Sequence, residues 1–181
     1  IYIGHEGRNK LDKFTPKGVY TGSCIGLDGD HVYDVVGDGQ YLYFAVNTAK
    51  IGRTDYDLSS VIEYIPSVPE IPFSLTIGKI GTTTYLFIGS TQGRVFKYIM
   101  YPSSATLAEF NLYGSSLPHV VGQLIYGLAL DSTNNYLYVS GGGKLSRYDP
   151  ITGNWIDDLN IFSYEPYDID IKTINVLYDI I

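Results

Sequence analysis

The stretch that decides the fold is residues 125–159, IYGLALDSTNNYLYVSGGGKLSRYDPITGNWIDDL. Three strand-length segments, at 126–130, 136–140 and 144–148, are separated by turns rich in Gly, Asn, Asp and Pro. A fourth segment begins at Asn154 and Trp155. Short segments divided in this way are typical of antiparallel strands that follow one another in a meander. This stretch therefore predicts one four-stranded sheet.

The same order of segments recurs upstream. Two further copies are expected, with strands at 33–36, 41–46, 50–55 and 61–65, and at 73–77, 85–89, 94–98 and 107–112. The N-terminal copy begins in its middle, with second, third and fourth strands at 1–4, 10–14 and 19–25. Residues 167–172 read as the first strand that this copy lacks, and 175–181 as a further strand. Internal repetition at such a period indicates a repeat architecture.

A basic tetrad marks the third strand of every copy. It has a basic residue at both ends and an aliphatic residue in second place: KLDK at 10–13, KIGR at 50–53, RVFK at 94–97 and KLSR at 144–147. These tetrads hold eight of the twelve Lys and Arg residues in the chain. Such a concentration at regular spacing shows that the repeat is real.

One copy resembles a known type of repeat in detail. The glycines that close YLYVSGG at 136–142, then RYDP at 147–150 and TGNW at 152–155, are similar to a blade of the kelch-like or quinoprotein-like β-propellers. The resemblance implies that the glycines end the second strand, that the Tyr-Asp turn follows the third, and that Trp155 packs between blades. It implies an architecture and no particular activity.

We therefore expect an all-β fold, a β-propeller of about four four-stranded antiparallel blades within a single domain spanning 1–181. The blades are expected at 1–31 together with 167–181, at 32–71, at 72–122 and at 123–166. Radial repetition protects the open edges of sheets, and a blade shared between the two chain ends would close the ring. Residues 175–181 have no place in this scheme. They would add at an edge, belong to a segment of a larger propeller, or pair with a neighbouring subunit.

Composition restricts the classes of partner. The net charge is −7 and the isoelectric point about 4.7, which argues against nucleic acid and anionic membranes, because both reward clustered Lys and Arg. The longest apolar runs have the length of strands, so membrane insertion is not expected. A single cysteine, Cys24, excludes an internal disulfide and is expected to be a buried thiol. Low lysine with abundant Tyr, Ser, Thr and Gly favours an extracellular or surface location.

Four residues are candidate metal ligands. His31 and His119 are candidates, together with Asp28 and Asp30 of an acidic turn, but no histidine pair has the spacing of a zinc motif. Calcium would suit the acidic turns, yet none matches the twelve-residue calcium loop. We expect solvated aspartates in turns, and no cofactor.

Tyrosine and arginine supply the candidate binding residues. The eighteen Tyr residues are expected mostly between blades, and the best candidates for surface contacts are those in loops: Tyr56, Tyr101, Tyr113 and Tyr164. Arg53 and Arg147 represent the tetrads. The tetrad cations would either face an anionic ligand, or bridge to acidic residues of neighbouring blades and lie over tyrosine rings, and we favour the second alternative.

These features favour a non-enzymatic module that binds a protein or glycan through loops at one end of the ring. Two alternatives stay open. One is a propeller-type metal-dependent lyase or hydrolase. The other is a structural subunit of a virion, surface layer or filament, in which the C-terminal strand is exchanged and links copies into a homo-oligomer.

Overall fold

The computed structural model describes residues 1–5, 7–27, 29, 31–100, 108–110 and 124–159, and this part of the chain is all β, without a helix. The strands are β1 (Tyr2–His5), β2 (Lys10–Phe14), β3 (Tyr20–Ile25), β4 (Val32–Gly37), β5 (Tyr41–Val46), β6 (Lys50–Asp55), β7 (Val61–Ile65), β8 (Pro72–Ile80), β9 (Thr83–Ser90), β10 (Val95–Ile99), β11 (Ala108–Phe110), β12 (Ile125–Asp131), β13 (Tyr136–Gly141), β14 (Lys144–Tyr148) and β15 (Trp155–Asp158).

These strands form four antiparallel sheets, each a meander of neighbouring strands. The first sheet is β1-β2-β3, and the second, third and fourth are β4 to β7, β8 to β11 and β12 to β15. The repeat that the sequence predicts is confirmed. The largest difference is the β8–β9 hairpin, which pairs as far as Ile80 and Thr83 although the sequence predicts strands at 73–77 and 85–89. Its Gly and Thr residues resemble a long turn, but only Gly81, with a φ of +60°, takes the left-handed conformation there.

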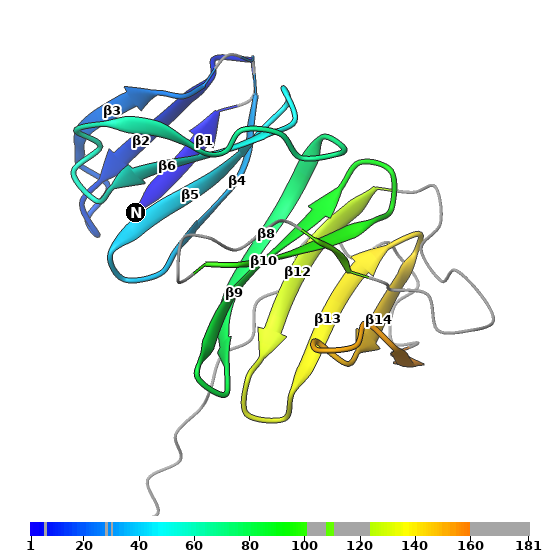
Figure 1. The fold of residues 1–181 in the computed structure, drawn as a ribbon. Coiled ribbons are helices and arrows are strands. Elements are labelled where there is room, and N and C mark those ends of the chain that lie inside the picture. The colour runs from blue at the N-terminus through cyan, green and yellow to red at the C-terminus, as the bar shows by residue number, and fades with distance from the viewer. Residues whose placement is uncertain (6, 28, 30, 101–107, 111–123, 160–181) are drawn as a thin grey trace, which may run out of the picture.

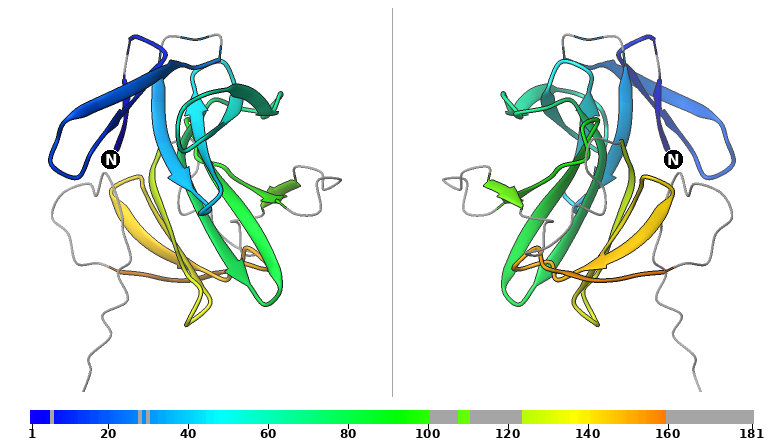
Figure 2. Two further views of the ribbon diagram at one scale, coloured as in Figure 1. Left: turned by 90° about the vertical axis from the view of Figure 1, so that its left-hand side faces the viewer. Right: turned by 90° about the vertical axis from the view of Figure 1, so that its right-hand side faces the viewer.

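The sheets follow one another in chain order around the molecule (Figures 1 and 2). The first strand of each sheet contacts the first strand of the next, β1 with β4, β4 with β8 and β8 with β12. Figure 2 shows the first and the last sheet on the same side of the molecule. Among the described strands no sheet closes on itself. The arrangement is propeller-like, with the outer strands β3, β7, β11 and β15 at the periphery.

The core is divided into three apolar clusters, one between each pair of consecutive sheets. Side chains alternate along β5, so that Leu42 and Phe44 pack toward the first sheet, whereas Tyr43 and Ala45 pack toward the third. The third cluster joins the third and fourth sheets and includes Phe87 of β9. Full burial of a large apolar side chain contributes roughly 1.5–3 kcal/mol, so these contacts dominate the association of the sheets.

Trp155 differs from what the resemblance to propeller blades implies. It starts β15, where its side chain is 38% exposed, and its indole Nε1 donates a hydrogen bond to Asp158. It therefore lies at the edge of the fourth sheet rather than buried between two sheets. Cys24 agrees with expectation, since it is buried against the second sheet and burial raises the pKa of its thiol.

Two predicted strands, at 167–172 and 175–181, lie outside the described residues, as does most of the connection between β10 and β12. The part of the chain that is described contains no helix of the length and apolarity needed to cross a membrane.

Candidate functional site

Three aromatic rings lie side by side near the starts of the innermost strands. The ring centroids of Tyr33 (β4) and Phe73 (β8) are 4.8 Å apart, and those of Phe73 and Tyr126 (β12) are 6.1 Å apart. Both values fall within the roughly 4.5–7 Å of favourable aromatic pairs. The imidazole of His31 stacks on Tyr33 at 5.6 Å and extends the series. Tyr33, Phe73 and Tyr126 are called the aromatic row below.

A β-bulge produces each position of the aromatic row. In β4 the pairing with β5 shifts between Val32 and Asp34, which leaves Tyr33 outside the register. The equivalent shifts in β8 and β12 fall at Phe73 and Tyr126. A bulge inserts one extra residue in a strand and redirects its side chain. Three sheets therefore direct one aromatic ring each to the same region of the molecule.

The residue after the bulge in β4, and the one after the bulge in β8, each hydrogen-bond to the next sheet. Asp34 accepts the backbone N–H of Leu75, in β8 of the next sheet, at 2.7 Å. Ser74 donates its hydroxyl to the carbonyl of Ile125, in β12 of the sheet after that, at 3.1 Å. These hydrogen bonds hold the starts of β4, β8 and β12 in a fixed relation. The aromatic row is thus preorganised by the backbone of three sheets.

The aromatic row is only half-buried, as is His31. Its rings therefore combine fixed positions with accessible surface. His31 is also tied to the first sheet, since its Nδ1 accepts the N–H of Gly7 at 3.3 Å. Chemically, this site offers apolar ring faces and edges together with one imidazole.

The two predicted arginines interact with aromatic and acidic side chains of their own sheets. The Arg53 guanidinium lies over the rings of Tyr41 and Tyr64, 4.4 and 5.1 Å from their centroids. That of Arg147 makes a two-pronged ion pair with Asp157 and lies 4.9 Å from the centroid of Tyr136. The hydrogen-bonded Asp157 carboxylate raises the pKa of Arg147, and the Arg147 guanidinium in turn holds the pKa of Asp157 below its usual value.

The other basic residues of the tetrads also bond to acidic side chains or to a backbone carbonyl. The first basic residue of a tetrad pairs with a carboxylate near its own strand, as Lys50 with Glu63, Lys144 with Asp158, Lys10 with Asp12 and Arg94 with the buried Glu70. Lys13 and Lys97 reach the next sheet, where they bond to Asp57 and to the carbonyl of Ile151. The tetrad cations thus pair in every sheet, but mostly with carboxylates of their own unit rather than of a neighbouring blade as predicted, and the ion pair of Lys13 with Asp57 joins two sheets.

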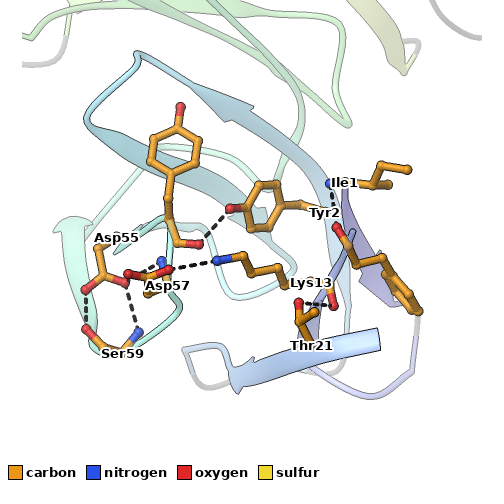
Figure 3. Close-up of polar contacts among 9 residues, drawn as sticks. Ile1, Tyr2, Lys13, Thr21, Asp55, Asp57 and Ser59 are labelled. Atoms are coloured by element: carbon orange, nitrogen blue, oxygen red, sulfur yellow. Dashed lines mark hydrogen bonds and ion pairs between the residues drawn. The ribbon is translucent and has the colours of Figure 1, made fainter. Parts of the chain in front are cut away.

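Tyr56 packs at the contact between the first and second sheets. Its ring meets that of Tyr2 edge-to-face at 5.8 Å, and its carbonyl accepts the Tyr2 hydroxyl at 2.6 Å. Figure 3 shows Tyr2 beside the ion pair of Lys13 and Asp57, which is 2.8 Å long. The half-buried Tyr56 therefore has a clear packing role, and its role as a ligand contact stays a prediction.

The acidic turn that contains Tyr56 is organised by Asp55. Its carboxylate accepts the backbone N–H groups of Asp57 and Ser59 and the Ser59 hydroxyl (Figure 3). The Ser59 hydroxyl, together with the backbone N–H groups, lowers the pKa of Asp55. Asp38, Asp131 and Asp149 bond to the backbone of their own turns in the same way. The sequence predicts solvated aspartates in turns, and the structure adds that these carboxylates bond to the backbone of their own turns.

Six predicted site residues lie outside the described part of the chain: Asp28, Asp30, Tyr101, Tyr113, His119 and Tyr164. Within the described part, no group of three or more His, Cys, Asp or Glu side chains is placed to hold a metal ion. The structure brings together His31, Tyr33, Phe73 and Tyr126, of which only His31 was a predicted site residue. The sequence did contain a pattern that pointed to Tyr33, Phe73 and Tyr126. In each of the three complete copies, the expected first strand begins with one of these aromatic residues.

Comparison with known proteins supports the fold. The chain is similar to the crystal structure of the computationally designed Ika4 protein, with a TM-score of 0.58 over 83% of this chain and 84% of that chain. The sequence identity is 13%, so the similarity shows the fold alone. No family model and no curated protein matches the chain.

Proposed function

We propose that this chain is a non-enzymatic binding module, built as a four-bladed β-propeller, that recognises a protein or glycan through the end of the molecule where the aromatic row lies. The observation that carries the proposal is the row itself. Three bulges place three half-buried rings side by side, and hydrogen bonds between sheets fix their positions. Rigid aromatic side chains provide contact area at a low cost in conformational entropy.

The charge of this chain favours a partner whose surface is neutral or of mixed charge, rather than a polyanion. The chain carries a net charge of −7, and its tetrad cations pair with carboxylates, carbonyls and tyrosine rings. A partner would instead meet ring faces and edges. Stacking on sugar rings and packing against apolar side chains are the two contacts that such a surface makes well.

The test compares substitutions inside and outside the aromatic row. Tyr126→Leu and Phe73→Leu keep apolar volume but remove the ring faces, and Tyr20→Leu removes an aromatic side chain that is 53% exposed on β3. Binding is measured on a glycan array and against a panel of purified extracellular proteins. We expect at least a tenfold loss of affinity for each row variant and less than a twofold change for Tyr20→Leu, with circular dichroism unchanged. Absence of wild-type binding in both formats, or equal affinity in all variants, contradicts the proposal.

The metal-dependent lyase or hydrolase remains the alternative, since His31 lies at the same end as the row. Its other candidate ligands, His119, Asp28 and Asp30, lie outside the described residues. Elemental analysis of the purified protein separates the two, because stoichiometric metal favours the enzyme. The structural-subunit alternative is tested by deleting residues 175–181, which would leave the assembly state unchanged if that strand is not exchanged.

A further inference from the structure

The planes of the rings in the aromatic row restrict the class of partner that the row can take. Tyr33 lies between two other rings, because the plane of His31 is 11° from its own plane and that of Phe73 is 35° from it. His31 is tied to the first sheet through the N–H of Gly7, whereas Phe73 belongs to β8 of the third sheet. The two rings therefore cover opposite faces of Tyr33, and neither face is open to a partner.

The contact between Phe73 and Tyr126 uses a further ring face. Their planes are 86° apart and their centroids 6.1 Å apart, so the edge of one ring meets the face of the other. One face of Phe73 already lies against Tyr33, with 4.8 Å between the centroids. Most ring faces in the aromatic row are thus covered by neighbouring rings. Because the three side chains are half-buried, the part that they expose consists mainly of ring edges.

Ring edges and ring faces suit different partners. The face of an aromatic ring carries the negative part of its quadrupole, and the edge carries the positive part. A sugar stacks its C–H groups on the face, which is the part that the aromatic row has covered. Ring edges instead pack against aliphatic side chains and approach the carbonyl oxygens of a polypeptide. The orientation of the rings therefore favours a protein over a glycan.

The charge of the chain favours the same class of partner. Its net charge is −7, which attracts a basic partner over long range. Proteins present Lys and Arg side chains, whereas the charged groups of glycans are mostly carboxylates and sulfates, which this chain would repel. The first basic residues of the tetrads do not attract such anions, since Lys10, Lys50 and Lys144 pair with carboxylates.

We propose that the aromatic row binds a protein segment and not a glycan, and that this segment presents an aliphatic side chain flanked by basic residues to the ring edges. The inference rests on the proposed binding function, because it names the class of partner for the same site. It requires that affinity depend both on the rings and on ionic strength.

Two probes used side by side test the inference. The full chain is immobilised and presented with a phage-displayed library of random linear peptides and, separately, with a glycan array. Enriched peptides are synthesised, and their affinities are measured for the wild type, for Phe73→Leu and Tyr126→Leu, and for the control Tyr20→Leu, whose aromatic side chain is 53% exposed on β3. The wild-type affinity is also measured at about 0.05 M and about 0.5 M sodium chloride, because salt screens charges over this range.

We expect enriched peptides with an aliphatic residue next to Lys or Arg, and at least fivefold weaker binding at the higher salt concentration. Each row variant should bind at least tenfold more weakly, and Tyr20→Leu should change affinity less than twofold. The peptide sequences and the salt dependence come from the wild type, so they test the inference even if a row variant folds poorly.

The outcomes separate this inference from the proposed function. Glycan binding that the row variants abolish would overturn the inference and leave the proposed function intact. Enrichment of acidic or purely polar peptides, affinities that do not respond to salt, or equal affinity in the row variants would also overturn it. Absence of binding to both probes would count against the proposed function itself, and the inference would fall with it.

Discussion

At the scale of single residues, Asp12 shows how the tetrads combine charge with burial. It is 5% exposed, and its two carboxylate oxygens lie 2.8 Å from His5 Nε2 and from Lys10 Nζ. Burial alone would raise the pKa of Asp12, but the hydrogen bonds from Lys10 and His5 outweigh it and hold the pKa below the usual value. Lys10 lies two residues away on β2, whereas His5 belongs to β1, and the pairing of two strands that brings His5 to Asp12 could not be read from the tetrad alone.

The Asp12 carboxylate is expected to make stability depend on pH. Because its pKa is lower in the folded chain, its contribution is complete above about pH 4 and is lost as the pH falls through the folded pKa. We predict that Asp12→Asn lowers the free energy of unfolding by about 1–3 kcal/mol at pH 7, and that this difference shrinks below pH 4. Urea unfolding at both pH values measures it. Asp57→Asn is the control, since that carboxylate is 86% exposed and should change stability by less than about 0.5 kcal/mol. An Asp12→Asn effect that does not vary with pH would refute this account.

At the scale of elements, alternation and turn residues were sufficient to predict most strands. The bounds of β2, β5, β6, β7 and β14 agree with the sequence prediction. The bulges at Tyr33, Phe73 and Tyr126 were not predicted, because a bulge depends on how two strands pair and leaves no mark in the periodicity of one strand. The aromatic row was missed for that reason, although its residues had been assigned to the correct strands.

Gly52 of β6 gives a prediction for a single strand. A Cβ there would lie 2.3 Å from the ring of Phe44, which is fully buried against the first sheet. We predict that Gly52→Ala lowers the free energy of unfolding by about 1–3 kcal/mol through overpacking. Gly22→Ala on β3 is the matched control, because no atom lies within 4 Å of its added Cβ and the substitution should be neutral or slightly stabilising. Chemical denaturation of both variants measures the difference, and equal losses would argue against a specific clash.

At the scale of the molecule, the order of the sheets followed from the repeat, whereas the contacts between sheets did not. Asp34 illustrates the difference, since its acceptor role toward Leu75 links two sheets that are about forty residues apart in sequence. We predict that Asp34→Ala accelerates hydrogen exchange of the Leu75 amide and lowers the free energy of unfolding by about 1–3 kcal/mol, because that buried N–H loses its acceptor. Asp131→Ala, in an exposed turn of the fourth sheet, should leave the Leu75 amide unchanged. Unaltered exchange in Asp34→Ala would show that the amide has another acceptor.

The third position of each tetrad has an evolutionary consequence. It is Asp12, Gly52, Phe96 and Ser146 in the four sheets, and in the second, third and fourth sheets this position lies on the face turned toward the preceding sheet. The four units began as interchangeable modules if they arose by duplication, yet each now fits only one neighbour. If one unit replaced another, the glycine at position 52 could stand where the Phe96 ring fills the interface between sheets. Likewise, the Asp12 carboxylate could stand where the Ser146 hydroxyl lies. Further growth of the molecule by copying a unit would therefore require simultaneous changes in two adjacent units.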